Sequence, residues 1–179
     1  MGRKIKIGFL GNTCNYAYFY AKYFQNHPEI EAICFIEHTN ISRDYPWWDD
    51  SSIDRESLPS WIVLLPSFKF PGGLLSHGNK LKFVLKKLQE CDLIHSFGLI
   101  SSIWALRSKK KFIYNSYGDI ISTPFIQNYF SVKNWFRAYL SRIILKKATR
   151  IFLNQTIDID FAIRLNVYHK SILIPLLYD

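Results

Sequence analysis

The sequence predicts an α/β fold with a Rossmann-like, doubly wound parallel sheet. Short apolar runs rich in strand-forming residues alternate with longer segments whose apolar residues recur at helical spacing. The chain opens and closes with a strand–helix–strand unit, and buried strands joined through a helix run parallel with a right-handed crossover. A length of 179 residues, 49% of them hydrophobic, is enough to bury a core. We therefore expect residues 1–179 to form one domain.

Seven segments have the length and composition of buried strands. They lie at 4–10, 32–36, 61–65, 93–94, 112–114, 150–154 and 171–174. Helical spacing of apolar residues predicts helices between them, at 16–24, 81–88, 101–106, 132–147 and 157–165. A Thr-Pro pair at 123–124 predicts one more short helix, because proline is favoured at the first helical position. Residues 38–60 and 66–78 are expected to be irregular.

The segment 132–147 has the clearest helical pattern in the chain. Its apolar residues keep the i, i+3, i+4, i+7 spacing of an amphipathic helix. They are Val132, Trp135, Phe136, Tyr139, Leu140, Ile143 and Ile144. Basic residues occupy the other side. We expect the apolar stripe, including its aromatic side chains, to face the sheet and the basic residues to face solvent.

Charge and cysteine usage narrow the function classes. The net charge of +9 leaves nucleic acid, an anionic membrane or a phosphorylated substrate as partners. No recognisable nucleic-acid module is present, so we do not expect nucleic acid. Cys14, Cys34 and Cys91 are far apart and form no Cys-x-x-Cys or His/Cys cluster, which indicates reduced thiols and no metal site. Without a spanning apolar run or a signal-peptide pattern, we expect a cytoplasmic protein.

Several segments, taken in order, resemble a known family. They are Asp92-Leu93-Ile94-His95, Asn115-Ser116-Tyr117-Gly118-Asp119, Ala148-Thr149-Arg150-Ile151, Asn154-Gln155-Thr156 and 170–175 with Asp179. The series resembles the N-terminal domain of glycosyltransferase family 4, a group of GT-B-fold, retaining, metal-independent enzymes. Thr149 stands where the family has an acid, and residues 176–178 replace its Asn-Gly-Val. The resemblance implies that residues 1–179 stop at the hinge before a C-terminal donor domain.

Ligands of open parallel sheets bind beyond the carboxyl ends of the strands, and the first such loop is Gly11, Asn12 and Thr13. Glycine lets another group approach the backbone, and the next helix begins with free N–H groups. The resemblance implies that this loop lines the substrate cleft, and a plain turn is the alternative. A nicotinamide site is a rival interpretation, but the spacing is not G-x-G-x-x-G and Glu37 is a weak ribose partner.

The second and third loops follow the strands near 94 and 113. The resemblance implies that His95 reaches the cleft, and the alternative is a histidine used for packing. It also implies that Tyr117, Gly118 and Asp119 face the acceptor, although Tyr117 or Asn115 stands where the family has histidine. Asp119 could accept hydrogen bonds from sugar hydroxyls, or it could cap a helix.

Two further motifs have alternative interpretations. Asp158-x-Asp160 matches the metal motif of the other large glycosyltransferase fold, but both acids lie in the first turn of a helix, where the helix dipole favours negative charge. Thr156 is expected to cap that helix. The segment 47–50, Trp-Trp-Asp-Asp, could form a sugar-binding platform. We prefer a loop whose tryptophans pack against the domain.

The resemblance implies transfer of a sugar from a nucleotide-sugar donor, a co-substrate rather than a cofactor, to a saccharide or lipid-linked acceptor. Residues 1–179 would supply acceptor contacts and would be inactive alone. The alternatives are a non-catalytic subunit that docks onto a donor-binding chain, and a generic nucleotide-binding domain. Basic residues in 80–87, 107–111 and 132–147 predict a further partner, the anionic inner face of the cell membrane, bound without spanning it.

Overall fold

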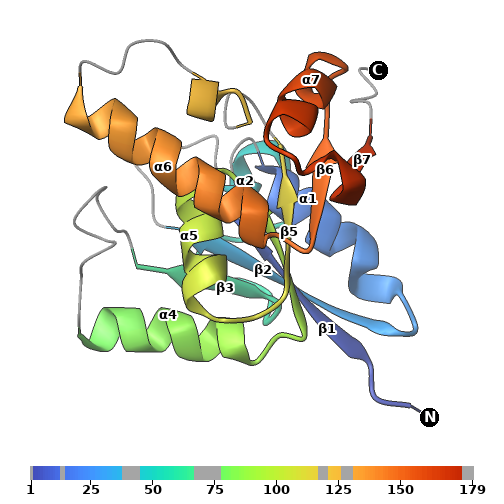
Figure 1. The fold of residues 1–179 in the computed structure, drawn as a ribbon. Helices are drawn as coiled ribbons and strands as arrows, with labels where there is room; N and C mark the ends of the chain where they lie inside the picture. The colour runs from blue at the N-terminus through green and yellow to red at the C-terminus, as the bar shows by residue number, and fades with distance from the viewer. Residues whose placement is uncertain are drawn as a thin grey trace.

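The computed structural model describes residues 2–12, 15–37, 45–66, 78–116, 121–125 and 131–174. In these residues seven strands form one sheet with the order β3-β2-β1-β4-β5-β6-β7, and every neighbouring pair is parallel (Figure 1). The strands are β1 (Ile5–Leu10), β2 (Ile30–Glu37), β3 (Ile62–Leu65), β4 (Leu93–Phe97), β5 (Phe112–Asn115), β6 (Arg150–Leu153) and β7 (Ser171–Leu173). All seven predicted strands are confirmed.

The strand order explains how the sheet is wound. The chain starts at β1 in the middle of the sheet, moves outward through β2 to β3, and returns past β1 to β4. From β4 it continues in the other direction to β7, so the reversal lies between β1 and β4. Leu10 pairs with both Phe35 and Ser96, which places the carboxyl ends of these three strands at one edge. The predicted Rossmann-like, doubly wound fold is confirmed.

Helices lie on both faces of this sheet. They are α1 (Tyr16–Tyr23), α2 (Pro46–Asp49), α4 (Asn79–Gln89), α5 (Leu99–Arg107), α6 (Val132–Lys147) and α7 (Ile157–Arg164), with 3-10 turns at Phe24–Asn26, Thr123–Phe125 and Tyr168–Lys170. In Figure 1, α4, α5 and α6 lie in front of the sheet and α1 lies behind it. The short helix α2 corrects the expectation that residues 38–60 are wholly irregular, and its first residue is a proline.

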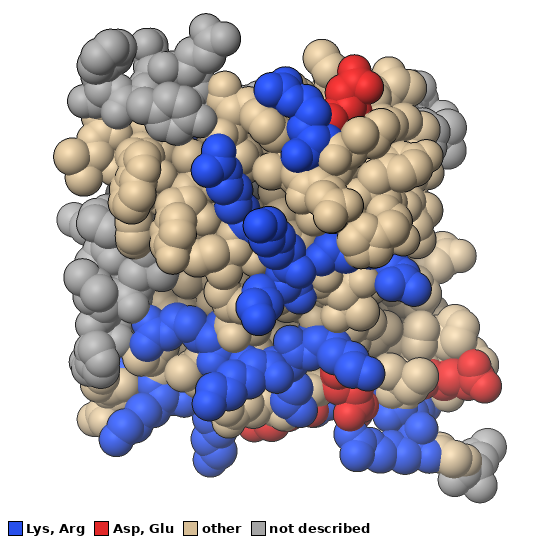
Figure 2. Space-filling model, viewed as in Figure 1, with Lys and Arg blue, Asp and Glu red and all other residues tan. Residues whose placement is uncertain are grey.

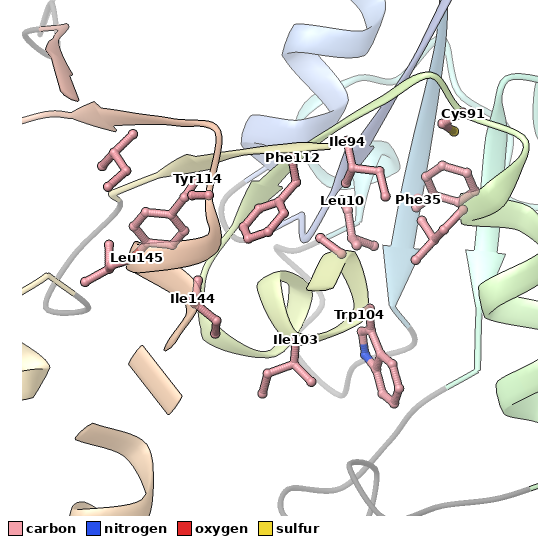
Figure 3. Packing of buried hydrophobic residues seen from close by; sticks show 14 of the residues in the cluster. Leu10, Phe35, Cys91, Ile94, Ile103, Trp104, Phe112, Tyr114, Ile144 and Leu145 are labelled. Carbon is pink, nitrogen blue, oxygen red and sulfur yellow. The ribbon is translucent and has the colours of Figure 1, made fainter. Parts of the chain in front are cut away.

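The larger core lies between the sheet and helices α4, α5 and α6 (Figure 3). Alternate residues of the strands point to this side, among them Phe35, Ile94 and Tyr114. Trp104 of α5 and Ile144 of α6 pack against them, and all five side chains are at most 1% exposed. Burying a large apolar side chain stabilises the fold by about 1.5–3 kcal/mol, so this layer contributes strongly to stability.

A second core lies on the opposite face of the sheet, beneath α1. Ala17, Tyr18 and Ala21 of α1 are completely buried there, together with Phe9 of β1. The two alanines have small side chains, so the α1 backbone can approach the sheet closely. This contact fixes where the loop after β1 begins its turn into α1.

Two of the three cysteines lie in these cores as free thiols. Cys34 belongs to the core beneath α1, and Cys91 belongs to the core beneath α4 and α5. Burial raises the pKa of the Cys91 thiol to about 11 and that of Cys34 well above its usual value. Cys14 lies outside the described residues. Among the residues described, no helix combines the length and the apolar character needed to cross a bilayer.

Helix α6 has the predicted bounds, but its predicted apolar stripe is buried only in part. Ile144 is buried and Leu140 packs against the core, whereas the prediction was wrong for Val132, Trp135 and Tyr139. Its buried residues are Ala138, Ser141, Ile144 and Leu145, whereas Trp135 and Tyr139 are 55% and 49% exposed. The helix packs on α5 and on the Thr123–Phe125 turn, and its buried side carries two small residues, Ala138 and Ser141. Small residues allow that close contact, so the larger aromatic residues remain outside.

Candidate functional site

Polar residues collect where the parallel strands end. Asn12 lies two residues after β1, Glu37 ends β2, Asn115 ends β5 and Asn154 follows β6, while a glycine, Gly98, follows β4. The carboxyl ends of parallel strands lie at one edge of a sheet, and this edge is where such sheets bind ligands. We refer to it below as the carboxyl edge.

Gly11 brings the loop after β1 into direct contact with the start of α5. Its φ of +93° lies in the region that favours glycine, and a Cβ there would lie 2.1 Å from Ser101 Oγ and 2.3 Å from the Phe97 carbonyl oxygen. The close approach inferred from the sequence is therefore present, and the group that approaches belongs to this chain. Gly98 has a φ of +90°, but a Cβ at Gly98 would meet nothing within 4 Å.

The Asn12 side chain holds the beginning of α1. Its Nδ2 donates to Asn15 Oδ1 over 2.7 Å, and its Oδ1 accepts from the backbone N–H of Tyr18 over 2.8 Å. Asn12 is 5% exposed and Asn15 is fully buried. The side chain thus acts as a helix cap from a position outside the helix. Substrate binding by Asn12 stays a prediction, and Thr13 lies outside the described residues.

The two acids of the 47–50 motif also bind α1. Asn15 Nδ2 donates to Asp49 Oδ2 over 2.6 Å. Asp50 Oδ2 accepts from the Tyr18 hydroxyl and forms an ion pair with the Lys22 ammonium. The Lys22 ammonium is the main reason that the pKa of Asp50 is lowered. Both carboxylates therefore have partners within the chain.

The two tryptophans of the same motif differ in their surroundings. Trp47 stacks on Tyr45 with ring centroids 4.4 Å apart, and the Arg55 guanidinium lies 5.9 Å from the Trp47 ring. Trp48 is 62% exposed. The preferred packing interpretation therefore describes Trp47, while Trp48 faces solvent.

His95 lies within β4, two residues before the strand ends, in a cluster of aromatic rings. Its ring centroid is 4.6 Å from Phe97, 5.3 Å from Phe152, 5.4 Å from Tyr20 and 5.6 Å from Phe9. The side chain is 5% exposed, and burial lowers its pKa to about 3. Within the described part of the chain, Nε2 has no hydrogen-bond partner. These surroundings fit the packing alternative, and a role for His95 in the cleft stays a prediction.

A hydrogen-bonded network closes the ends of β5 and β6. Asn154 Nδ2 donates to Asn115 Oδ1 over 3.1 Å and also to the Ser116 carbonyl oxygen. Ser116 Oγ donates to Asp158 Oδ2 over 3.1 Å, which links this edge to α7. The network holds Asn115 and Ser116 in place at the end of β5. Tyr117, Gly118 and Asp119 lie outside the described residues, so their predicted acceptor contacts stay predictions.

Asp158 lies in the first turn of α7, as the sequence predicted, and it also binds the end of β5 through Ser116. It is 7% exposed, and burial raises its pKa while the bond from Ser116 opposes that shift. Thr156 precedes α7 as expected, but its hydroxyl makes no capping hydrogen bond there. Asp160, the other acid of the Asp-x-Asp pair, is exposed. In the part of the chain that the structure describes, no cluster of His, Cys, Asp and Glu could hold a metal ion.

Glu37, the last residue of β2, has a strongly perturbed carboxyl group at the carboxyl edge. Burial raises its pKa to about 7, and Oε1 is buried with no hydrogen-bond partner among the described residues. A carboxyl group in this state can hold a proton near neutral pH and donate a hydrogen bond. The sequence marked Glu37 as a weak ribose partner only, because a burial of this degree depends on neighbours distant in the chain.

Comparisons with known proteins bear on the fold. No protein-family model and no curated protein matches the sequence. Among solved structures, the chain is similar to Anabaena Alr3699/HepE in complex with UDP and glucose, with a TM-score of 0.57 and 16% identity over 98% of this chain and 45% of that chain.

Two further solved structures also match almost the whole of this chain with about half of their own length. UDP-N-acetylglucosamine 2-epimerase from Rickettsia bellii matches with a TM-score of 0.54 and 12% identity, over 96% of this chain and 44% of that chain. S. aureus MnaA, in a co-structure with UDP, matches with a TM-score of 0.57 and 10% identity, over 100% of this chain and 49% of that chain.

At such identities the likeness concerns the fold alone, and membership of glycosyltransferase family 4 stays a prediction. The chain spans less than half the length of these proteins, which leaves about half of each without a counterpart in residues 1–179. Sheet order and structural matches together identify this chain as a Rossmann-like unit with the fold of the N-terminal half of GT-B-type proteins.

Proposed function

We propose that residues 1–179 are the acceptor-side half of a glycosyltransferase that moves a sugar from a nucleotide donor to a saccharide or lipid-linked acceptor. The supporting observation is the match of 98–100% of this chain to structures in complex with UDP, one of them also with glucose. The ordered family-4-like segments at 92–95, 115–119 and 148–156 add support for transfer over other nucleotide-sugar chemistry.

The carboxyl edge would contribute acceptor contacts. Asn154 binds both Asn115 and Ser116 at the end of β5, directly before the segment in which Gly118 and Asp119 are proposed to meet the acceptor. Asp119 would accept a hydrogen bond from an acceptor hydroxyl, and glycine would leave room for the sugar. The nucleotide would be bound mainly by a second half, either in the same chain or in a partner subunit, and transfer would be retaining and metal-independent.

A specific observation favours a second candidate, a UDP-N-acetylglucosamine 2-epimerase. The Rickettsia bellii enzyme matches this chain almost as well as HepE does. A non-catalytic binding subunit of a split glycosyltransferase is a third candidate. A generic nucleotide-binding domain is a fourth, and it would bind UDP without turnover.

The test compares residues 1–179 with the complete protein that contains them, or with their partner subunit added. Each is incubated with a panel of nucleotide sugars and acceptors, and products are separated by mass. We expect a glycosylated acceptor from the complete system only. Turnover by residues 1–179 alone would contradict the two-half proposal. Conversion of UDP-N-acetylglucosamine without an acceptor would assign the epimerase activity instead.

Asp119→Ala separates acceptor binding from stability in the complete system. Loss of a charge-assisted hydrogen bond to a sugar hydroxyl costs about 1.5–3 kcal/mol, so kcat/KM should fall by about 10- to 150-fold while the fold is retained. Asp160→Ala is the matched control, because it removes an exposed acid from α7. Equal kinetics for the Asp119 variant and wild type would assign Asp119 to a capping role.

We also place the protein in the cytoplasm, on the inner face of the cell membrane and without a spanning segment. The support is the net charge of +9 and the grouping of basic residues on α4, α6 and the segment 107–111. An acceptor linked to a lipid would be reached from that position.

A further inference from the structure

The outward side of α6 begins with exposed apolar residues and ends with basic ones. Val132, Trp135 and Tyr139 are 84%, 55% and 49% exposed, and Arg142 and Lys146 continue the same side at helical spacing. We call these five residues the α6 face. The Trp135 and Tyr139 rings stack with centroids 5.7 Å apart and an angle of 3° between their planes. The two stacked rings therefore form one continuous apolar patch at the surface.

The surroundings of the α6 face are strongly basic. Helices α4, α5 and α6 contain no Asp or Glu at all. Basic residues on these helices and on the turn after α5 are Lys80, Lys82, Lys86, Lys87, Arg107, Lys109, Lys110, Lys111, Lys133, Arg137, Arg142, Lys146 and Lys147. Figure 2 shows Lys and Arg side chains spread across the middle and lower part of this side of the molecule.

Four basic residues of α6 have no acidic partner in the part of the chain that the structure describes. Lys133, Arg137, Lys146 and Lys147 are exposed, and none of them pairs with a carboxylate among the described residues. A partner for this side therefore has to bring negative charge. It also has to accept two aromatic rings whose edges carry a hydroxyl and an indole N–H.

We propose that the α6 face docks on an anionic lipid bilayer, with Trp135 and Tyr139 in the headgroup region and the basic residues against lipid phosphates. Tryptophan and tyrosine are enriched at the membrane interface, where one end of the ring is apolar and the other is wet. Lysine and arginine next to them bind the anionic leaflet. A protein partner fits less well, because lysine is depleted in protein interfaces and three apolar residues form a small patch.

The direction of α6 links docking to the candidate site. Helix α6 ends at Lys147, directly before β6 begins, and Thr149 N–H donates to the carbonyl oxygen of Phe112 at the start of β5, so the last turn of α6 lies near the amino ends of the strands. The aromatic pair lies in the other half of the helix, farther from these amino ends. Docking through it would turn that end of the domain toward the bilayer, which favours an acceptor whose sugar is attached to a lipid. This inference names the surface that holds the protein at the membrane. The lipid-linked substrate itself rests on the proposed function.

The experiment measures sedimentation of residues 1–179 with vesicles of phosphatidylcholine alone, or with about one-third phosphatidylglycerol. Wild type should bind the anionic vesicles, and the double variant Trp135→Ser/Tyr139→Ser should bind them about tenfold more weakly. Lys146→Glu/Lys147→Glu should weaken binding at low salt. Trp48→Ser is the matched control, because Trp48 is an exposed tryptophan on α2, and it should bind as wild type does. Circular dichroism and urea denaturation verify that each variant is folded.

The outcomes distinguish docking through the α6 face from membrane attachment of the protein in general. If the aromatic double variant binds anionic vesicles as tightly as wild type, the α6 face is not the docking surface, while electrostatic attachment still stands. If wild type binds neither kind of vesicle, both the placement and the inference are wrong. A dimer of wild type that the double variant loses, or a single-stranded oligonucleotide that competes with the vesicles through the same aromatic residues, would identify a different partner and overturn the inference.

Discussion

Replacing Glu37 with glutamine tests how the carboxyl edge responds to pH. Glu37 is half-buried at the end of β2, and its Oε1 is enclosed with no hydrogen-bond partner among the described residues. Glutamine has nearly the same shape but cannot ionise. The substitution therefore removes the cost of burying a charge and leaves the packing in place.

The expected magnitude follows from the pKa. Burial raises the pKa of Glu37 from 4.5 to about 7, and one pKa unit corresponds to about 1.36 kcal/mol, so the full effect is about 3 kcal/mol. The folded state holds the proton more tightly than the unfolded chain. The stability contributed by protonated Glu37 is therefore complete below pH 4.5 and is lost as the pH rises to about 7. The free energy of unfolding of Glu37→Gln should therefore exceed that of wild type by less than about 1 kcal/mol at pH 5 and by about 3 kcal/mol at pH 8.

Urea denaturation at pH 5, 6, 7 and 8 measures this difference. Glu31→Gln on the same strand is the matched control, because Glu31 is exposed and pairs with Lys6 at 2.9 Å. An exposed pair contributes less than about 1 kcal/mol, so the control should change stability little across this range. A Glu37→Gln effect that is the same at pH 5 and pH 8 would refute the burial of an ionisable Glu37.

Three further predictions concern the same edge. Gly11→Ala should lower the free energy of unfolding by about 3 kcal/mol or more, because its new methyl group would overlap α5. Gly98→Ala should lower it less, by about 1–2 kcal/mol, because Gly98 has open space and only its positive φ is strained. The imidazole resonances of His95 should not titrate between pH 5 and 8, since its pKa is about 3, and a midpoint in that range would exclude the aromatic surroundings. Asn15→Ala should lower the free energy of unfolding, measured by urea denaturation, by about 2–4 kcal/mol, because the buried side chain loses its hydrogen bonds to Asn12 and Asp49. Asn26 is exposed, so Asn26→Ala should leave this free energy unchanged within about 0.5 kcal/mol.

The sheet could be predicted because its signals are local. Segments such as 32–36 and 112–114 are short, apolar and bounded by polar residues, so each identifies its own strand. The strand–helix–strand alternation then fixes parallel pairing, and the crossover rule limits the order of the strands. These signals need no knowledge of residues far away in the chain.

The site could be predicted only in part because its geometry depends on distant contacts. The glycine at 11 indicated close approach, but the sequence could not show that Ser101 would be the neighbour. The pattern of α6 likewise gave an apolar stripe without showing that Ala138 and Ser141 would make the closer contact. The burial of Glu37 also arises only when separate segments come together.

The two buried thiols can report how often each helix layer separates from the sheet. Cys34 lies in the layer beneath α1 and Cys91 in the layer beneath α4 and α5, so one thiol is enclosed on each side of the sheet. Both pKa values are raised by burial, and a protonated, enclosed thiol reacts slowly with alkylating reagents. In a Cys14→Ser background, the labelling rate of each thiol would report how often its own layer separates from the sheet. The two faces could then be ranked in lability within a single sample, without introducing a probe.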